Sequence, residues 1–425
     1  MAVSASSSSV RPTFNAPDLH ARIMRLRAID DATNWLYIAK EYSCIVAVIA
    51  AVVTFCESRA GWGLGWFWNV PVMAAGMVLI GALQHRLAGL GHEASHYTLF
   101  RNKWLNDFVG DALCMFPVLG TTHFYRVFHL AHHQFTNDPE RDPDLVSLGG
   151  SKMVDRFPMG RWEFVKSIYL RVFTEPGAFV RYSNDYFSIN VLGGASNEYL
   201  KRAPGADASG KVWPRLGAVL GAVYLVFYIL ATWTLTLTRQ SAWLPPLCLS
   251  SLATVLAVWA LLPDRAFFPS PFRQPISPRV SGLMRLVYYT MMLTGLSLLR
   301  EPTGGKSAVY YVLLWIVPLG TTFLFFMLLR DVYQHTNADD GRLTNSRVFF
   351  ADPFTRWAVF VYGQDMHVPH HLFPAIPHYR LPQLHRLLKD RHADYAEQVV
   401  EVEGTFTGQN GRPSILDVLC EDRGE

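Results

Sequence analysis

The sequence predicts an all-α integral membrane protein with about six transmembrane helices and a cytoplasmic helical cap. The first observation behind this prediction is composition, since the 425 residues are 50% hydrophobic and only 17% charged. Soluble domains carry about 25% charged residues. The second is a mean hydropathy of only +0.15, which is too low for a chain that lies wholly in a membrane. The apolar residues must therefore be concentrated in separate blocks.

Several uncharged stretches have the length that a membrane crossing requires, which is about 20 residues for a helix. The fifth stretch is interrupted by Arg285 and is the least certain by composition alone. Three uninterrupted apolar stretches in one half of the chain are more than the core of a soluble domain needs. The crossings are expected near residues 42–57, 64–85, 215–238, 243–262, 280–299 and 308–329.

Basic residues supply the third observation, because Lys and Arg are enriched in the cytoplasmic loops of membrane proteins. They are frequent in the segments 1–40, 86–213 and 263–279 and sparse in the short connections between the other crossings. This alternation fits six crossings with both termini in the cytoplasm. It divides the chain into an N-terminal cytoplasmic arm over 1–40 with a disordered Ser-rich start, a membrane domain over 41–379, and a C-terminal cytoplasmic tail over 380–425.

Other classes of protein lack support in the sequence. There is no run of five basic residues, which argues against nucleic-acid binding. The five cysteines are scattered and form no CxxC pair, so zinc ribbons and redox motifs are not indicated. No internal repeat supports a transporter built from duplicated halves.

Histidines form the main chemical signal. An HxxxH motif begins at His92, and HxxHH motifs begin at His129 and His367. Chance predicts roughly 0.02 HxxHH matches in a chain of this composition. Residues three and four apart lie on one face of a helix, and neutral imidazole binds Fe, Zn, Cu and Ni. The motif histidines, which brought together could bind more than one ion, are His92, His96, His129, His132, His133, His367, His370 and His371, and His335 lies just after the last crossing.

These motifs can meet only if they lie on one face of the membrane. An even number of crossings must then separate His133 from His335, whereas only three uninterrupted apolar stretches lie between them. Segment 280–299 must therefore span as well, and the metal site is expected on the cytoplasmic side.

Carboxylates near the motifs are candidates to orient the ligands, because a ligating imidazole usually donates its second N–H to a carboxylate or carbonyl. A solvated surface charge is the alternative for each of them. These candidates are Glu93, Asp138, Glu140, Asp142, Asp144 and Asp331. Of the other histidines, His85 is expected at a helix end and His123 in a loop. His378, His385 and His392 recur every seven residues, which is typical of one face of a surface helix.

The stretches HEASHYTLFRNKWLNDFVG, YRVFHLAHHQFTNDPERDPD and HVPHHLFPAIPHYRLPQLH resemble the three histidine boxes of the membrane fatty acid desaturase and hydroxylase superfamily. The resemblance covers residues 80–150 and 320–390. It implies that the nine histidines hold two Fe ions that use O2 as co-substrate, and that Asp331 stands where relatives hold a metal-associated water. Members of this superfamily are usually described with four spanning helices, whereas this sequence predicts six. No His-Pro-Gly-Gly haem motif appears, so a separate electron donor is expected, such as ferredoxin or cytochrome b5 with its reductase.

The expected function is therefore O2-dependent desaturation of a fatty acyl or related lipid chain at the bilayer. Hydroxylation, or oxidative decarboxylation of a fatty acid, is an alternative, because the position of the substrate rather than the ligand set decides the product. Two alternatives come from other classes. A histidine-rich metal transporter should place its ligands near the membrane midplane, and a structural zinc membrane protein needs only four ligands.

Overall fold

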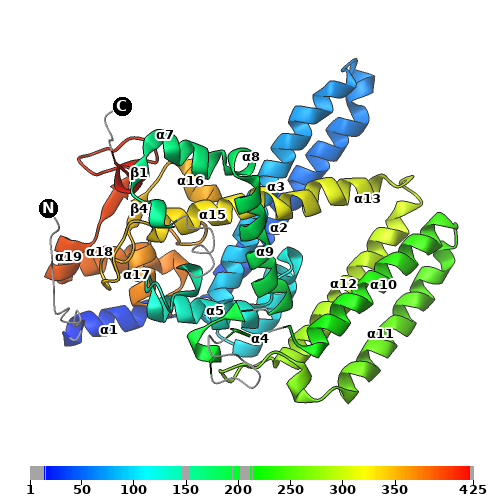
Figure 1. Cartoon of the computed structure of the whole chain (residues 1–425), viewed down its shortest axis with the longest axis horizontal. Helices are drawn as coiled ribbons and strands as arrows, with labels where there is room; N and C mark the ends of the chain where they lie inside the picture. The colour runs from blue at the N-terminus through cyan, green and yellow to red at the C-terminus, as the bar shows by residue number, and fades with distance from the viewer. Residues whose placement is uncertain are drawn as a thin grey trace.

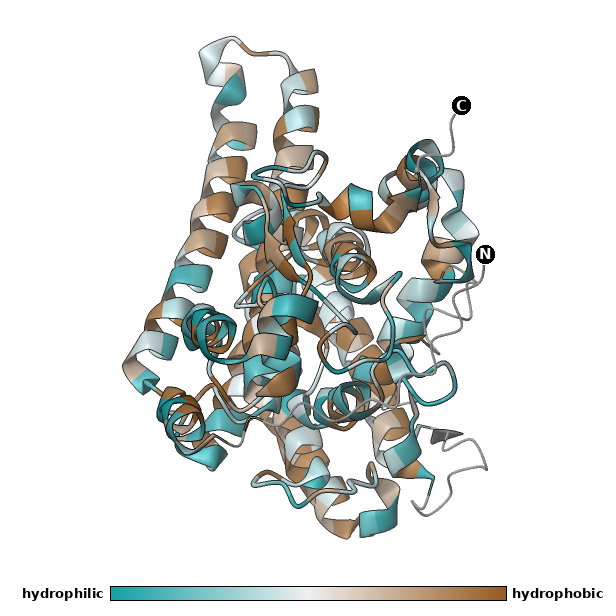
Figure 2. Cartoon of the chain, turned by 90° about the vertical axis from the view of Figure 1, so that its left-hand side faces the viewer, coloured by the Kyte–Doolittle hydropathy of each residue, from teal (hydrophilic) through white to brown (hydrophobic). Residues whose placement is uncertain are grey.

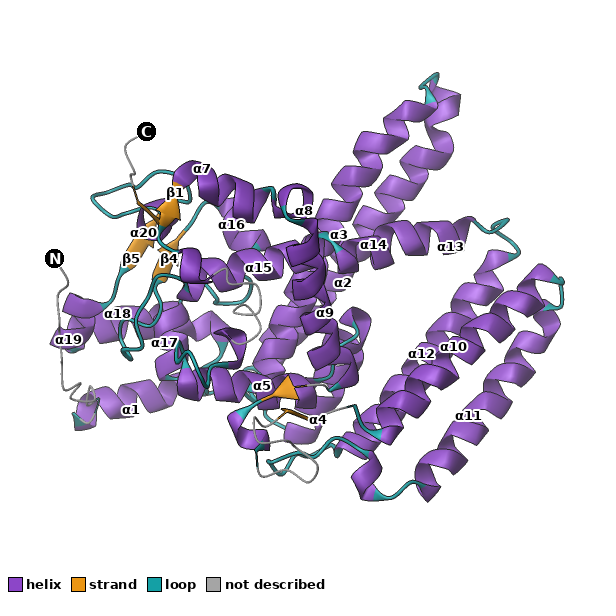
Figure 3. Ribbon diagram, in the orientation of Figure 1, coloured by secondary structure: helices purple, strands orange, loops and turns teal. Residues whose placement is uncertain are grey.

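A computed structural model describes residues 14, 16–145, 154–193, 195–201, 211–212 and 214–421. Within these residues nearly all of the regular secondary structure is helical, as Figure 3 shows. The predicted disordered start of the arm lies outside the described residues, apart from Phe14 and Ala16. The helices are α1 (Pro17–Leu26), α2 (Asp31–Ser58), α3 (Asn69–Ser95), α4 (Lys103–Val109), α5 (Thr122–Phe135), α7 (Arg161–Phe164), α8 (Arg171–Thr174), α9 (Pro176–Leu192), α10 (Leu216–Leu237), α11 (Leu244–Leu261), α12 (Pro278–Arg300), α13 (Lys306–Tyr311), α14 (Val317–Gly320), α15 (Thr322–His335), α16 (Pro353–Ala358), α17 (His367–Leu372), α18 (Leu381–Arg391), α19 (Ala393–Gln398) and α20 (Ile415–Leu419).

In the described part of the chain, six helical segments are long and apolar enough to cross a membrane, which confirms the predicted all-α membrane protein with six spanning helices and includes the doubtful 280–299 segment. Large apolar side chains on them face outward; Leu261 is 85% exposed and Phe227 68%. Exposed apolar area on this scale requires a lipid environment, and Figure 2 shows hydrophobic residues along the projecting α2–α3 hairpin. The six segments are Asp31–Trp62, Trp66–Ser95, Leu216–Leu237, Ser241–Leu261, Pro278–Arg300 and Lys306–His335.

The first two spanning helices run beyond their apolar stretches. Asp30 caps α2 by accepting a hydrogen bond from the Ala32 amide. Helix α3 continues past residue 85, where the predicted crossing ends, because its polar residues find partners inside the protein rather than in lipid. Arg86 forms a buried ion pair with Glu41, at 2.8 Å between Nη2 and Oε1. As a result α3 carries the first histidine motif in its last turn.

Helices α10, α11 and α12 form a group that stands apart from α2 and α3 in Figure 1. Helix α12 lies between the other two and bonds to α10 through Tyr224–Thr290 (2.7 Å) and Tyr228–Thr294 (2.5 Å). Helix α13 follows α12 and leads through α14 into α15, which packs on α3. These three crossings therefore form a module beside the helices that carry the histidines.

The C-terminal segment folds back onto the face that carries the histidines. Parallel pairing joins Val348 to Glu401, and α18 packs its apolar side into a core with α1. His378 and His385 are each only 5% exposed. Their seven-residue spacing wrongly predicted a surface face, because it follows the apolar side of α18 and of the turn before it. The short strands are β1 (Met159–Gly160) with β6 (Cys420–Glu421), β2 (Ala195–Ser196) with β3 (Lys211–Val212), and β4 (Val348–Phe350) with β5 (Glu401–Glu403).

Candidate metal centre

Four helices bring the histidine motifs together at one end of the α3–α15 pair. His92 lies in the last turn of α3, and His96 follows immediately after it. Helix α5, capped by the Thr121 side chain, carries the second motif along its last two turns. His335 ends α15, and His367 begins α17. Helix ends from distant parts of the chain thus share one location.

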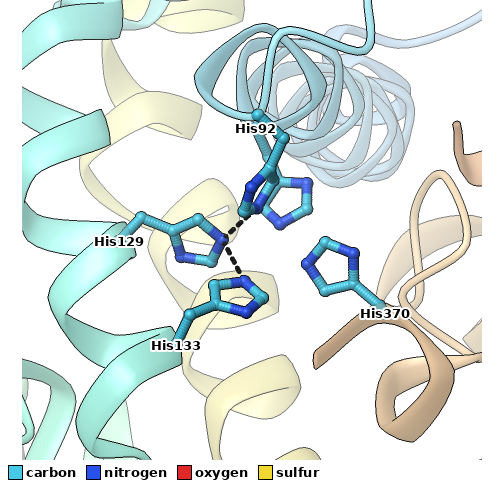
Figure 4. Close-up of side chains that lie close together, drawn as sticks. His92, His129, His133 and His370 are labelled. Carbon is cyan, nitrogen blue, oxygen red and sulfur yellow. Dashed lines mark hydrogen bonds between the residues drawn. The ribbon is translucent and has the colours of Figure 1, made fainter. Parts of the chain in front are cut away.

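The nine histidines form two groups. Cluster A comprises His92, His96, His129, His133 and His370, and cluster B comprises His132, His335, His367 and His371. In each group one ring nitrogen per residue lies within 4.8 Å of all the others. Figure 4 shows four members of cluster A turning their rings toward a common point.

Each HxxHH motif divides its histidines between the two clusters. On α5, His129 and His133 are four residues apart and join cluster A, while His132 joins cluster B. On α17 the division is reversed, with His370 in cluster A and the outer pair in cluster B. Around a helix, position i+4 is rotated by about 40° from position i, and position i+3 is rotated to the opposite side of i. The side chains of one motif therefore point in two directions. The prediction that all the imidazoles of a motif share one helix face and point the same way is therefore wrong for the two HxxHH motifs.

The donor spacing fits metal ions. In cluster A the Nε2 atom of His129 lies 2.9 Å from that of His96 and 3.0 Å from that of His133. In cluster B the Nε2 atoms of His335 and His367 lie 2.7 Å apart. Two nitrogens bound at about 2.1 Å to one ion stand about 3 Å apart when they subtend a right angle. The Nε2 atom of His370 is buried without a hydrogen-bond partner, as expected for a donor reserved for a metal.

The electrostatics keep most of these rings neutral. Burial and the neighbouring imidazoles hold the pKa of His129, His133 and His370 well below the ordinary histidine value. Burial also disfavours the charged form of His132, but the carboxylates of Asp142 and Asp144 outweigh it and raise the pKa of His132 to about 9. Neutral imidazole is the form that binds metal. Asp142 and Asp144 stabilise the positive charge of a protonated His132. A metal cation bound at cluster B would supply positive charge in place of that proton.

The second ring nitrogens of three cluster B histidines have fixed partners. His132 Nδ1 lies 2.9 Å from Asp142 Oδ1 and 3.2 Å from Asp144 Oδ2. His335 Nδ1 lies 3.1 Å from the Asn345 carbonyl oxygen. His371 Nδ1 lies 3.1 Å from Thr136 Oγ1. Such contacts select the tautomer that leaves Nε2 free for the ion.

The remaining carboxylate candidates occupy different places. Glu93 is buried beside His92, with its Oε2 atom 3.2 Å from His378 Nδ1 and 2.9 Å from Thr98 Oγ1. Asp331 binds Arg330 and the Tyr182 hydroxyl at the edge of the clusters. Asp138 pairs with Arg141 instead of with a histidine. Glu140 is exposed and lies in the same turn.

Other residues of the centre were not found by sequence reasoning. Gln364 Nε2 lies 3.2 Å from His92 Nε2 and receives support from Gln334. Arg126 of α5 donates to the carbonyl oxygens of Ala94 and Ser95 (2.9 Å each) at the end of α3, and it pairs with buried Asp107. This arginine ties the first motif to the second. The sequence around Arg126 does not indicate this role, because only the fold brings the arginine to the end of α3.

A cavity of about 70 Å³ lies against both clusters. Its wall combines aromatic residues, among them Tyr125 and Tyr186, with the charged residues Asp185, Arg330 and Asp331. Histidines of both clusters complete the wall. The arrangement gives a small space that touches both groups of ligands.

Comparison with known proteins agrees with this geometry. The profile of the family described as fatty acid desaturase matches residues 66–264 and 238–401. A dihydrorhizobitoxine desaturase of Bradyrhizobium elkanii is 24% identical over 411 residues, which cover 95% of this chain and 88% of that protein. An sn-1 oleoyl-lipid 12-desaturase of Arthrospira platensis is 29% identical over 33% of this chain and 38% of its own length. A ferredoxin-type sn-1 acyl-lipid omega-3 desaturase of a Nostoc species is 25% identical over 35% and 38%. The chain belongs to the fatty acid desaturase family and is an integral membrane oxidoreductase of the desaturase type.

Proposed function

We propose that clusters A and B hold two iron ions and that the enzyme uses O2 to introduce a double bond into a fatty acyl or related lipid chain. The observation that carries this proposal is the division of nine buried or half-buried histidines into two adjoining groups of donors. Family membership supports desaturation as the reaction type. The 70 Å³ cavity against both clusters provides the place where the reacting carbons would lie.

The donor set argues against the other classes of metal protein. A structural zinc ion needs four ligands, whereas nine nitrogens are gathered here. A transporter should hold its cargo near the membrane midplane, but His92 and His335 lie in the last turns of their spanning helices. A site whose nitrogen ligands lie at the ends of spanning helices is suited to an enzyme that binds its substrate at the membrane surface.

When bound, two iron ions supply the O2-dependent oxidation that removes hydrogen from an unactivated C–H bond. Overall, a CH2–CH2 unit loses two hydrogens, and O2 takes these with two electrons and two protons from a donor to give two waters. The chain's own residues position the reaction: Asp142, Asn345 and Thr136 orient the ligand rings. Tyr125 and Tyr186 wall the cavity, so the substrate's position there decides between desaturation and hydroxylation.

One observation favours a second substrate class. Asp185, Arg330 and Asp331 place charge directly in the cavity beside the ligands, where a long hydrocarbon segment would gain nothing from it. The relative that matches over nearly its whole length is named for dihydrorhizobitoxine rather than for a lipid. A compound with polar groups close to the reacting bond is therefore the second candidate substrate.

The electrons come from a separate protein in this proposal, as the name of the ferredoxin-type relative illustrates for that protein. Both termini and the two clusters are proposed to lie on the cytoplasmic side, because the basic residues concentrate in the segments on that side.

The reaction is tested by mass spectrometry of lipids and polar metabolites from a host that expresses the protein. Desaturation predicts products two mass units lighter than a host compound. Products sixteen units heavier would establish hydroxylation, and a terminal alkene would establish decarboxylation. Either of these would replace the desaturase assignment.

A further inference from the structure

A second, larger cavity lies within the membrane-spanning part of the protein. It measures about 490 Å³ and lies among α10, α12 and the segment that follows α13. Most of its wall is hydrocarbon. Among the described residues of that wall, the charged side chains are three arginines, Arg215, Arg285 and Arg300, with no aspartate or glutamate. Its lining contains no histidine of cluster A or B.

One end of this cavity is polar and buried. His123 lies on α5 rather than in the predicted loop and is only 4% exposed, yet neither of its ring nitrogens has a hydrogen-bond partner among the described residues. Burial, together with Arg285 and Arg126, keeps the pKa of His123 well below its ordinary value, so the ring is neutral and offers one N–H. Unsatisfied buried nitrogens in an apolar cavity are costly unless a ligand pairs with them.

Arg285 stands at the same end. Its Nη1 donates to the Val191 carbonyl oxygen at 2.9 Å, and its guanidinium lies 5.8 Å from the Phe124 ring centre. Arginine offers five N–H donors in a planar fork that suits phosphate. One bond to a backbone carbonyl leaves most of that fork available for an anion beside His123.

The polar end of the cavity lies on the same side of the membrane as the metal clusters. His123 precedes His129 by six residues of α5, or about 9 Å along the helix, so the polar end lies at the membrane face that carries the metal clusters. Arg300 lies fifteen residues beyond Arg285 on α12, about 22 Å further along. The cavity therefore extends from one face into the bilayer, with α10 and α12 side by side as one wall.

We infer that this cavity binds an anionic membrane phospholipid, with its phosphate against His123 and Arg285 and an acyl chain between α10 and α12. A phosphate provides the acceptors that the imidazole and guanidinium lack, and the hydrocarbon wall accommodates the chain. The absence of carboxylates from the wall favours an anionic headgroup. This lipid site is separate from the centre that carries out the desaturation and does not depend on it.

Native mass spectrometry of the full-length protein in a mild detergent tests the proposal after incubation with equal amounts of phosphatidylglycerol, phosphatidylcholine and oleic acid. The wild type should retain phosphatidylglycerol in preference to the other two. His123→Phe keeps an aromatic ring and breaks no hydrogen bond, so it should fold; it and Arg285→Gln should each lower that retention by about ten-fold. Arg285→Lys should restore part of it.

Arg265→Gln is the matched control, because this exposed arginine lies near the same end of α11 but does not line the cavity. It should retain phosphatidylglycerol like the wild type. Equal retention of phosphatidylglycerol and phosphatidylcholine by the wild type would overturn the proposal. So would preferential retention of oleic acid, or unchanged retention in folded His123→Phe and Arg285→Gln proteins.

Discussion

The Nε2 atoms of His132 and His335 lie 3.2 Å apart, although 203 residues separate the two histidines in the chain. His132 reaches this contact from α5, whose other two motif histidines belong to cluster A. A single helix therefore supplies ligands to both clusters. Because α17 does the same from the opposite side, the two sites are held at a fixed separation by the helices themselves.

Replacing His132 should abolish turnover without removing the protein from the membrane. His132→Ala takes one of four nitrogens from cluster B and leaves Asp142 and Asp144 without their partner. We expect activity to fall by at least about 100-fold, measured as product formed per membrane-bound protein. His20→Ala, at an exposed histidine of α1, is the control and should retain full activity. Substantial turnover in His132→Ala would argue strongly against the proposed ligand set.

Asp142 should act through His132. Asp142→Asn weakens the acceptor that orients the His132 ring at 2.9 Å. Loss of such a contact typically lowers metal affinity or activity by about 10- to 100-fold, so both iron content and turnover should decline. Asp138→Asn changes the same residue type four positions earlier, where the carboxylate pairs with Arg141 instead of a histidine. If both variants behave alike, the proposed role of Asp142 is wrong.

Arg126 should support both stability and metal content. Arg126 and Asp107 are 1% and 3% exposed and lie 2.5 Å apart, and the arginine also holds the end of α3. Removing one partner of a buried pair costs about 3–5 kcal/mol, so Arg126→Gln should lower the midpoint of thermal unfolding and reduce bound iron.

The control for this prediction is Arg141→Gln, which breaks an ion pair whose arginine is exposed. Exposed pairs are worth about 0–1 kcal/mol, so its unfolding midpoint should stay close to that of the wild type. An unchanged midpoint in Arg126→Gln would show that the buried network does not hold the two motifs together.

Hydropathy predicted five of the six spanning helices directly, because lipid contact imposes long apolar stretches on the sequence. The requirement that the histidines share one membrane face added the segment around Arg285, which is long and apolar enough to span. Helix ends were less predictable. Arg86 lies beyond the predicted end of the second crossing, yet α3 continues because Glu41 neutralises it within the protein.

The ligand motifs could be located from the sequence, but their division between two clusters could not. His132 and His133 are adjacent in the chain and point about 100° apart around α5, but only the folded arrangement of α5, α15 and α17 shows which cluster each one joins. The contact between Glu93 and His378 joins residues 285 positions apart and leaves no local pattern. His123 was expected in a loop, but it lies on α5 and is buried near Phe268 and Arg285, which come much later in the chain.

The proposed pair of iron sites can be tested by metal analysis of purified protein, reconstituted with ferrous iron and compared with two single-site variants. We expect about two irons per wild-type chain and about one in His370→Ala and in His371→Ala, which each remove a ligand from a different cluster. Zinc in place of iron, a single iron in the wild type, or loss of both ions from either variant would contradict two separately held irons.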